Sequence, residues 1–456
     1  MSFPDHRAQD GSAATFRKST EGGEGRRTLV VVPTLPLPTR GGVDLRNWEI
    51  VKALASMGPV AVFGLAGGSE EAPGQESIEV WRTSDDPELG PRIERALGSS
   101  EWAAGHPSDA YFAPQVVEEL RNLIATFRPT LVVFEQIWTH HYIETVKAKY
   151  LPVVLDAHNV EGALDAEIAW SLTRGRQATL RRAELAERLG AIEMSAFRRV
   201  DQLWLTSQRD ARLASDRYGD TAPKIVVPNA VDVDSYRART PNARASVPGQ
   251  PTIVLAGTFA YPPNVVAARF LVEEVLPRLW KRLPAARLRL VGREPPGFIR
   301  AAAEHEPRIE VTGAVPDTKP FFAEAFAAAV PLFQGGGTRL KVLEAFAAGT
   351  PVVATTKAIE GLDVVEGTHY LPAERPEEFV EAIASLWDDP ARAGDIAARA
   401  GRLVQEHYSS DVVRRCVYSA VGSLEATSTQ RSPLASPSFS KPVDAGEDFE
   451  APIRSP

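Results

Sequence analysis

The sequence predicts an α/β protein of two doubly wound domains, each a parallel sheet with helices on both faces. The chain has 456 residues, which is too many for one compact core. Short strands that are almost wholly apolar, such as TLVVFE, alternate with helical stretches, as expected for sheets buried on both faces. This alternation stops at a polar, proline-containing stretch and then starts again. We therefore expect two domains that face each other.

The first series begins with an apolar run that ends in a proline-rich turn. Similar runs predict strands at residues 28–36, 59–66, 130–136, 151–162, 202–207 and 224–232. Amphipathic stretches between them predict helices at 45–58, 114–129, 164–200 and 208–219. Gly58 is a natural stop for the first of these helices.

The second series follows the linker with the strand TIVLAGTF. Strands are predicted at 252–259, 286–292, 308–315, 327–333 and 351–355, and helices at 264–284 and 319–326. We divide the chain into a disordered tail (1–27), a first domain (28–235), a linker (236–250), a second domain (251–405), a helix packing back toward the first domain (406–425) and a second disordered tail (426–456).

Composition narrows the function classes. The net charge is −8 with acids and bases scattered, which argues against a nucleic-acid-binding protein. The single cysteine, Cys416, excludes an internal disulfide. No run of about 18 apolar residues predicts a membrane span, and the polar start lacks the apolar stretch of a signal peptide. We expect a cytoplasmic protein, with peripheral contact at the inner membrane face left open.

The stretch FQGGGTRLKVLEAFAAGTPVVAT, residues 333–355, carries the clearest chemistry. Thr338 is a candidate helix N-cap, and a helix start with free N–H groups is suited to a phosphate. Arg339 and Lys341 add positive charge there. Glu344 lies six residues after Thr338, about 9 Å along a helix, and a carboxylate can accept both hydroxyls of a ribose. The alternative is a strand–turn–helix connection with solvated charges, but Glu344 lies among apolar residues, where an unpaired carboxylate is costly.

The segment GGGTRLKVLEAFAAGTPVVATTKAIEGL resembles the nucleotide-sugar segment of the retaining GT-B glycosyltransferases of family 4. Segments resembling the family's first loop and helix, its interdomain region and the first half of its second domain occur in the family's order, over residues 28 to about 425. The resemblance implies the GT-B fold, with two Rossmann-like domains across a cleft, the first on the acceptor side. It implies transfer of a sugar from a nucleotide-diphosphate sugar to a glycan or lipid-linked acceptor, as in polysaccharide biosynthesis. Retention of configuration and no metal or cofactor requirement are also implied.

The resemblance also assigns residues on the donor side. Glu344 matches the second acid of the family's paired glutamates, while the first acid is replaced by Gly336, which leaves the contact to the donor sugar open. The loop GTFAYPPN lacks the cations that the family often has there, so Arg339 and Lys341 are expected to hold the diphosphate as catalytic residues. The expected donor-binding set on this domain is Gly336, Gly337, Thr338, Glu344 and Arg293, the last near the base or merely an exposed loop charge.

Further candidates lie on the first domain. Gly41 and Gly42 could let backbone N–H groups approach the β-phosphate. His158 lies at a strand end where the family often has a histidine, and it is expected to act as a catalytic residue through contact with the sugar or acceptor rather than as the general base. Asp156 and Glu161 either orient its ring or cap the loop. The expected acceptor-side residues are Arg46, His140 and His141. Arg46 either reaches phosphate or is a solvated helix residue. The two histidines either contact the acceptor or simply belong to a polar loop.

Two other functions stay open at this point. A nucleotide-sugar 2-epimerase would need carboxylates and histidines arranged for proton transfer, and no such set is evident. A non-catalytic nucleotide-sugar-binding subunit fits the loss of the first acid at Gly336. The basic helical region 164–200 could meet an anionic lipid surface, but we favour a solvated helix face because Glu184, Glu187 and Glu193 interrupt its cations.

Overall fold

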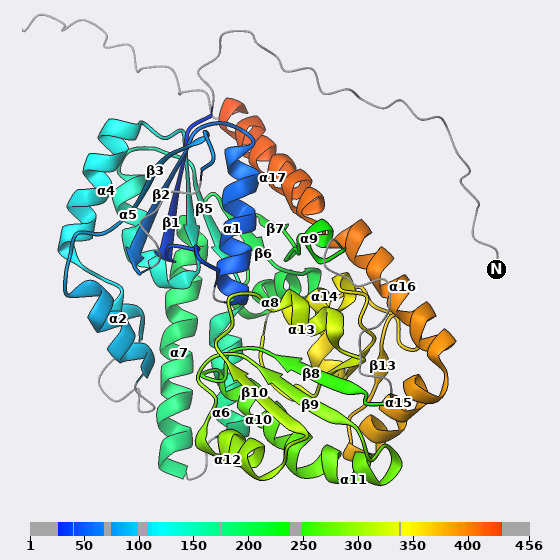
Figure 1. Ribbon diagram of the computed structural model, residues 1–456. Coiled ribbons are helices and arrows are strands. Elements are labelled where there is room, and N and C mark those ends of the chain that lie inside the picture. Colours follow the sequence, from blue (N-terminus) through cyan, green and yellow to red (C-terminus); the bar gives the residue numbers. More distant parts are fainter. Residues whose placement is uncertain are drawn as a thin grey trace, which may run out of the picture.

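The computed structural model of the chain describes residues 26–39, 41–67, 74–98, 107–172, 176–237, 249–336 and 339–430. The described residues form two domains, each with one parallel sheet flanked by helices, as Figure 1 shows. The predicted fold class is therefore confirmed. Among the described residues, no helix has the length and apolar character needed to cross a bilayer.

The first domain is built on a seven-stranded sheet in the order β3-β2-β1-β4-β5-β6-β7. Its strands are β1 (Thr28–Thr34), β2 (Val60–Ala66), β3 (Ile78–Thr83), β4 (Leu131–Glu135), β5 (Val153–Ala157), β6 (Gln202–Leu205) and β7 (Lys224–Val226). The central strands are buried along their length because helices cover both faces. β3, at the edge of the sheet, was not expected from the sequence, since two exposed charged residues, Glu79 and Arg82, interrupt its apolar residues.

The helices of the first domain connect these strands and pack on the sheet. They are α1 (Gly42–Ala55), α2 (Leu89–Gly98), α3 (Pro107–Ala110), α4 (Pro114–Phe127), the 3-10 helix η1 (Ile137–Tyr142), α5 (Ile143–Lys147), α6 (Glu161–Leu172), α7 (Arg176–Arg199) and α8 (Gln208–Tyr218). The short helix α9 (Val233–Arg237) follows β7 and packs in the core of the second domain.

The second domain has a six-stranded sheet in the order β10-β9-β8-β11-β12-β13. Its strands are β8 (Thr252–Ala256), β9 (Arg287–Val291), β10 (Ile309–Gly313), β11 (Ala327–Val330), β12 (Val352–Ala354) and β13 (Leu371–Pro372). Its helices are α10 (Pro262–Arg269), α11 (Leu276–Arg282), α12 (Gly297–His305), α13 (Lys319–Glu324), α14 (Leu340–Ala347), η3 (Thr356–Ile359), α15 (Pro376–Asp388) and α16 (Pro390–His407). The helix expected over 264–284 is interrupted by a π-helical turn, η2 (Phe270–Val275).

The last described helix returns to the first domain. Helix α17 (Ser410–Gln430) lies beside α1 in Figure 1. Its Val413, Val417 and Ala420 belong to the same hydrophobic cluster as Ile50 of α1. The amide of Gln202 donates a hydrogen bond of 2.9 Å to the carbonyl of Ala420. The chain therefore crosses between the domains twice within its described part.

The strand order indicates where a ligand would bind in each domain. In each sheet the order reverses beside the first strand of the domain, between β1 and β4 and between β8 and β11. Ligands of open parallel sheets bind at the carboxyl ends of strands at such a reversal. The loops that leave β1, β5, β8 and β11 carry most of the residues singled out in the sequence, including Gly41, His158 and Gly336.

Candidate active site

The glycine-rich loop after β11 leads into α14. The helix begins at Leu340, with Arg339 at the N-cap position and no cap from that side chain, so capping of the helix by Thr338 stays a prediction. Gly337 and Thr338 themselves lie outside the described residues. Gly335 has a positive φ of 115°, and a Cβ there would lie 2.9 Å from the Tyr261 hydroxyl. The loop therefore needs glycine at 335 for both its conformation and its close packing.

Arg339 is a buried cation at the start of α14, with only 7% of its surface exposed. Its Nη1 donates to the carbonyl of Gly336. Its Nε and Nη2 are buried and have no hydrogen-bond partner among the described residues. Burial lowers the pKa of Arg339, but a guanidinium stays charged in proteins. Leaving such donors unpaired is costly, so the site is prepared for an acceptor, best of all an anion.

Lys341 lies near Arg339 at the same end of the helix. Its ammonium donates to Oδ1 of Asn264, and a Cβ on Gly257, just after β8, would lie 2.9 Å from it. Burial, together with the positive charge of Arg339, lowers the pKa of Lys341 to about 7. The two cations gather where the loop after β8 meets the start of α14. This arrangement favours a ligand that brings negative charge.

Glu344 lies one turn further along α14 and is 8% exposed. Its Oε1 accepts hydrogen bonds from the hydroxyls of Tyr236 at 2.7 Å and Thr318 at 2.8 Å. Burial raises its pKa, and these two hydrogen bonds oppose that rise. The carboxylate is thus held in place, and its Oε2 has no hydrogen-bond partner among the described residues. Contact with ribose hydroxyls stays a prediction for this oxygen.

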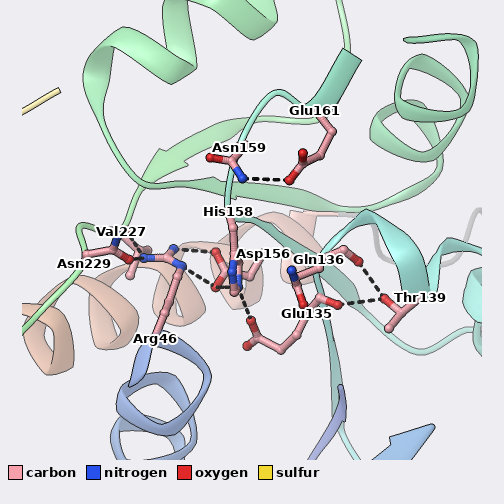
Figure 2. A network of polar contacts seen from close by, with 10 residues as sticks. All are labelled: Arg46, Glu135, Gln136, Thr139, Asp156, His158, Asn159, Glu161, Val227 and Asn229. Carbon is pink, nitrogen blue, oxygen red and sulfur yellow. Dashed lines mark hydrogen bonds and ion pairs between the residues drawn. The ribbon is translucent and has the colours of Figure 1, made fainter. Parts of the chain in front are cut away.

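A buried polar network lies below the carboxyl ends of β4 and β5 in the first domain (Figure 2). The guanidinium of Arg46 holds both oxygens of Asp156, at 2.5 and 2.9 Å, and Nη1 also donates to the carbonyl of Val227 and to Oδ1 of Asn229. Arg46 is 2% exposed. The expectation that it is solvated or reaches phosphate is therefore wrong, because its charge is neutralised inside the domain.

His158 belongs to the same network. Its Nε2 lies 3.2 Å from Oε2 of Glu135, and Figure 2 shows the ring directed toward Glu135 and Asp156. Burial lowers the pKa of His158 to about 3, so the ring is neutral. Burial raises the pKa of Glu135, and the neighbouring Asp156 raises it further. The ring faces the interior of the domain, so contact of His158 with sugar or acceptor stays a prediction.

Glu135, Asp156 and His158 bring ligand atoms within 4.8 Å of one another, a spacing that could hold a metal ion. However, both oxygens of Asp156 are already bound by Arg46, which supplies the positive charge that this group needs. A divalent cation would have to lie beside that guanidinium. The donor set therefore fits an internally paired structural network better than a metal site.

The loop after β5 is fixed by a residue that the sequence did not single out as functional. Glu193 of α7 accepts the backbone N–H groups of Glu161 at 2.6 Å and Gly162 at 2.8 Å, and also the hydroxyl of Tyr218. Glu193 is fully buried, whereas Glu184 and Glu187 are exposed. The interpretation of Glu193 as part of a solvated face is thus wrong. In the sequence Glu193 is one acid within a run of charged residues, and nothing in that pattern shows that it binds the backbone at the start of α6.

The remaining candidates differ in how close they lie to α14. A Cβ on Gly42 would lie 3.0 Å from the side chain of Leu340, so the loop after β1 meets the start of α14. Arg293 is largely exposed and donates to Oγ1 of Thr258 at 3.2 Å. His140 and His141 lie on η1 with ring centroids 3.9 Å apart, and His141 Nε2 bonds the carbonyl of Ser108. Their roles toward an acceptor stay predictions.

Contacts across the two domains surround the glycine-rich loop. Glu167 of α6 accepts the N–H of Gly335 at 3.2 Å and pairs with Lys357 at 2.7 Å. A Cβ on Gly336 would lie 3.2 Å from Oδ1 of Asn159 and 3.3 Å from Leu164. The loop expected to hold the donor therefore lies directly against the first domain.

Comparisons with known proteins agree with this architecture. Residues 250–389 match the family model described as glycosyl transferases group 1. A search of curated proteins finds no relative.

Three solved structures have similar folds. Sucrose-phosphate synthase from Thermosynechococcus elongatus superposes with a TM-score of 0.67 and 16% identity, covering 88% of this chain and 100% of that one. Anabaena HepE in complex with UDP and glucose superposes with a TM-score of 0.61 and 16% identity, covering 87% of this chain and 99% of that one. Trehalose 6-phosphate synthase from Burkholderia multivorans superposes with a TM-score of 0.60 and 14% identity, covering 90% of this chain and 99% of that one. The chain thus has the GT-B fold, and its second domain matches the glycosyl transferases of group 1.

Proposed function

We propose that this protein is a glycosyltransferase that moves a sugar from a nucleotide-diphosphate sugar to an acceptor hydroxyl. The observation that carries the proposal is the buried guanidinium of Arg339, two of whose nitrogens have no partner among the described residues. It lies beside Lys341 at the start of a helix, where backbone N–H groups add positive potential. The match of residues 250–389 to glycosyl transferases of group 1 supports the same assignment.

The order of the charged groups matches the order of parts in such a donor. Glu344 lies deepest along α14, Lys341 and Arg339 lie at its start, and Gly336 lies in the loop beyond. A nucleotide-diphosphate sugar presents ribose, diphosphate and sugar in that sequence. Glu344 then accepts from the ribose hydroxyls, the two cations hold the diphosphate, and the sugar lies near Gly336 and the first domain. HepE, a similar fold, is known in complex with UDP-glucose.

The chemical step follows from this placement. The bond between the anomeric carbon and the β-phosphate oxygen breaks, and the electron pair leaves with the nucleotide diphosphate. Arg339, Lys341 and the start of α14 stabilise the developing negative charge. The acceptor hydroxyl forms the new bond from the same face, its proton passing to the leaving phosphate, so configuration is retained. The cations of the protein serve in place of a metal ion, and contact between the domains excludes water.

The proposed acceptor is a hydroxyl of a glycan or of a lipid-linked glycan, bound on the first domain. The epimerase alternative is not favoured, because the comparisons lead to glycosyltransferases. Within the first-domain network the neutral His158 and the internally paired Asp156 are not arranged as a proton-transfer pair open to a sugar.

Calorimetric titration tests the proposal. UDP, GDP, ADP and their glucose conjugates are titrated into the wild type and into Arg339→Ala, Lys341→Ala and Glu344→Ala. At least one conjugate should bind the wild type, and Arg339→Ala should weaken it roughly 10- to 100-fold, since hydrogen bonds to charged groups are worth about 1.5–3 kcal/mol. Arg278→Ala, in an exposed ion pair with Glu377, is the control. Unchanged binding and turnover in all three site variants would refute the assignment.

A further inference from the structure

The glycine-rich loop packs against the first domain at Gly336. A Cβ at this position would lie 3.2 Å from Oδ1 of Asn159 and 3.3 and 3.4 Å from the methyl groups of Leu164. The first-domain loop after β5 therefore reaches the glycine-rich loop where the proposed function places the donor sugar.

Glu161, the first residue of α6, is the acid that directly follows this loop. Its Oε1 accepts a hydrogen bond of 2.7 Å from the amide of Asn159. Its Oε2 has no hydrogen-bond partner among the described residues. Figure 2 shows Asn159 and Glu161 on the side of the loop away from Glu135 and Asp156. The two side chains thus form a pair that is separate from the buried network around Arg46.

The surroundings of Glu161 connect it to the second domain. Burial raises the pKa of Tyr261 to about 12; Arg339 lowers this pKa, whereas the charge of Glu161 raises it. The hydroxyl of Tyr261 packs against Gly335, the residue before Gly336. Burial also raises the pKa of Glu161 itself to about 8, with Glu193 and Asp165 adding to the rise. At neutral pH a carboxyl with such a pKa can both donate and accept hydrogen bonds.

The loop is also rigid at this point. The N–H groups of Glu161 and Gly162 are both held by Glu193, at 2.6 and 2.8 Å. The carboxylate of Glu193, not the side chain of Glu161, therefore satisfies the start of α6. This leaves the Glu161 carboxyl without a structural task at the helix terminus, and a fixed backbone below it is what a preorganised binding group requires.

We propose that Glu161, oriented by Asn159, binds hydroxyl groups of the transferred sugar from the first domain, beside the place where Asn159 and Leu164 pack against Gly336. The inference rests on the proposed function and adds to it a sugar-recognising acid on the opposite domain from the diphosphate site. The nucleotide is then held by one domain and the sugar by both. Recognition of the sugar requires the two domains to be together, which ties sugar recognition to closure.

The test compares binding of UDP-glucose with binding of UDP, by calorimetry at pH 7, in the wild type and in Glu161→Ala and Glu161→Gln. If UDP is not the base that the protein accepts, GDP with GDP-glucose or ADP with ADP-glucose forms the pair. Glu161→Ala should leave the affinity for the nucleoside diphosphate within about twofold and weaken the sugar conjugate roughly tenfold. Glu161→Gln, which keeps a donor and an acceptor, should restore most of that loss.

The control is Glu187→Ala, an exposed acid on α7 that should change neither affinity. Thermal unfolding of each variant checks that the loop is intact. An unchanged ratio of the two affinities in Glu161→Ala would overturn this inference while the proposed function stands. Failure of the wild type to bind any of the six compounds would overturn the proposed function, and this inference with it.

Discussion

The ammonium of Lys357 lies 2.7 Å from a carboxylate oxygen of Glu167, and this ion pair joins the second domain to the first. Lys357 also lies 2.7 Å from Glu360, which in turn pairs with Arg209 of the first domain at 2.7 Å. Alternating charges therefore cross between the domains twice. The other oxygen of Glu167 accepts the N–H of Gly335, so the same acid holds the glycine-rich loop.

Replacing Glu167 with glutamine should loosen the contact between the domains. The pair is partly exposed, so it is worth only about 0.2–1 kcal/mol and is screened by salt. Small-angle scattering of the unliganded protein should show a larger radius of gyration for Glu167→Gln than for the wild type at 50 mM NaCl. At 500 mM NaCl the radius of gyration of the wild type should approach that of the variant.

Arg82→Gln is a matched control, because it breaks a pair of the same 2.7 Å distance, with Asp85, inside the first domain. It should leave the radius of gyration unchanged. Equal radii for Glu167→Gln and the wild type at low salt would show that the pair does not hold the domains together.

The lowered pKa of Lys341 gives donor binding a pH dependence. Burial and Arg339 set this pKa at about 7, and Glu344 opposes them. An anionic diphosphate beside the ammonium would raise the pKa again, so binding at pH 8 should take up close to one proton. The affinity for a nucleotide-diphosphate sugar should therefore fall as the pH rises above 7. Calorimetry in two buffers of different ionisation enthalpy measures the uptake.

Lys341→Met should abolish both the proton uptake on binding and the fall in affinity above pH 7. Lys281→Met, on the surface of α11, should abolish neither. The same shift affects folding, because the unfolded chain keeps an ordinary lysine pKa. Between pH 7 and about 10.5 the unfolded state binds more protons, so the free energy of unfolding of the wild type should rise with pH relative to Lys341→Met. Proton uptake equal in the wild type and Lys341→Met would mean that another group titrates.

The architecture could be predicted because it depends on repeated local patterns. Apolar runs such as TLVVFE and VVLDA are buried whichever strands pair with them, so the parallel sheets followed directly. The strand β3 was missed because Glu79 and Arg82, both exposed at the sheet edge, leave it without a continuous apolar run. The π-helical turn within 264–284 was missed as well, since an amphipathic stretch does not show where a helix bulges.

Candidate site residues could be picked out from the sequence only where their own segment carries the chemistry. Arg339, Lys341 and Glu344 share one helix and its entry loop, so their spacing is visible in the chain. The roles of Arg46 and Glu193 depend on partners far away in the sequence, Asp156 and Tyr218. A charged residue within a helix has the same local pattern whether it faces solvent or a distant buried partner. Tertiary contacts decide between the two.

Breaking the Arg46–Asp156 pair should strongly destabilise the first domain. Both side chains are essentially fully buried, so removing one partner leaves the other charge uncompensated, at a cost of about 3–5 kcal/mol. Arg46→Ala should lower the free energy of unfolding in urea by about that amount. The double variant Arg46→Met/Asp156→Leu should be less destabilised than Arg46→Ala, because no charge then remains unpaired.

Arg121→Ala offers a comparison, since its pair with Glu118 has the same 2.5 Å distance but is exposed. Its effect should stay below about 1 kcal/mol. A double variant as unstable as the sum of its two single variants would contradict the buried-pair account.

Helices α6 and α7 cross where two glycines meet, and this crossing supports the start of α6, which carries Glu161. A Cβ on Gly162 would lie 2.9 Å from Cα of Gly190 and 2.9 Å from the hydroxyl of Tyr218. Gly162→Ala should therefore lower the free energy of unfolding by about 1–3 kcal/mol, because backbone cannot yield as a side-chain end can. Gly422 lies on the exposed side of α17, where a Cβ would have nothing within 4 Å, so Gly422→Ala should instead stabilise by about 0.5–1 kcal/mol. Since the same displacement would move Asn159 and Glu161, Gly162→Ala should also weaken the sugar conjugate more than the nucleoside diphosphate. Destabilisation with an unchanged ratio of those two affinities would separate the helix crossing from sugar recognition.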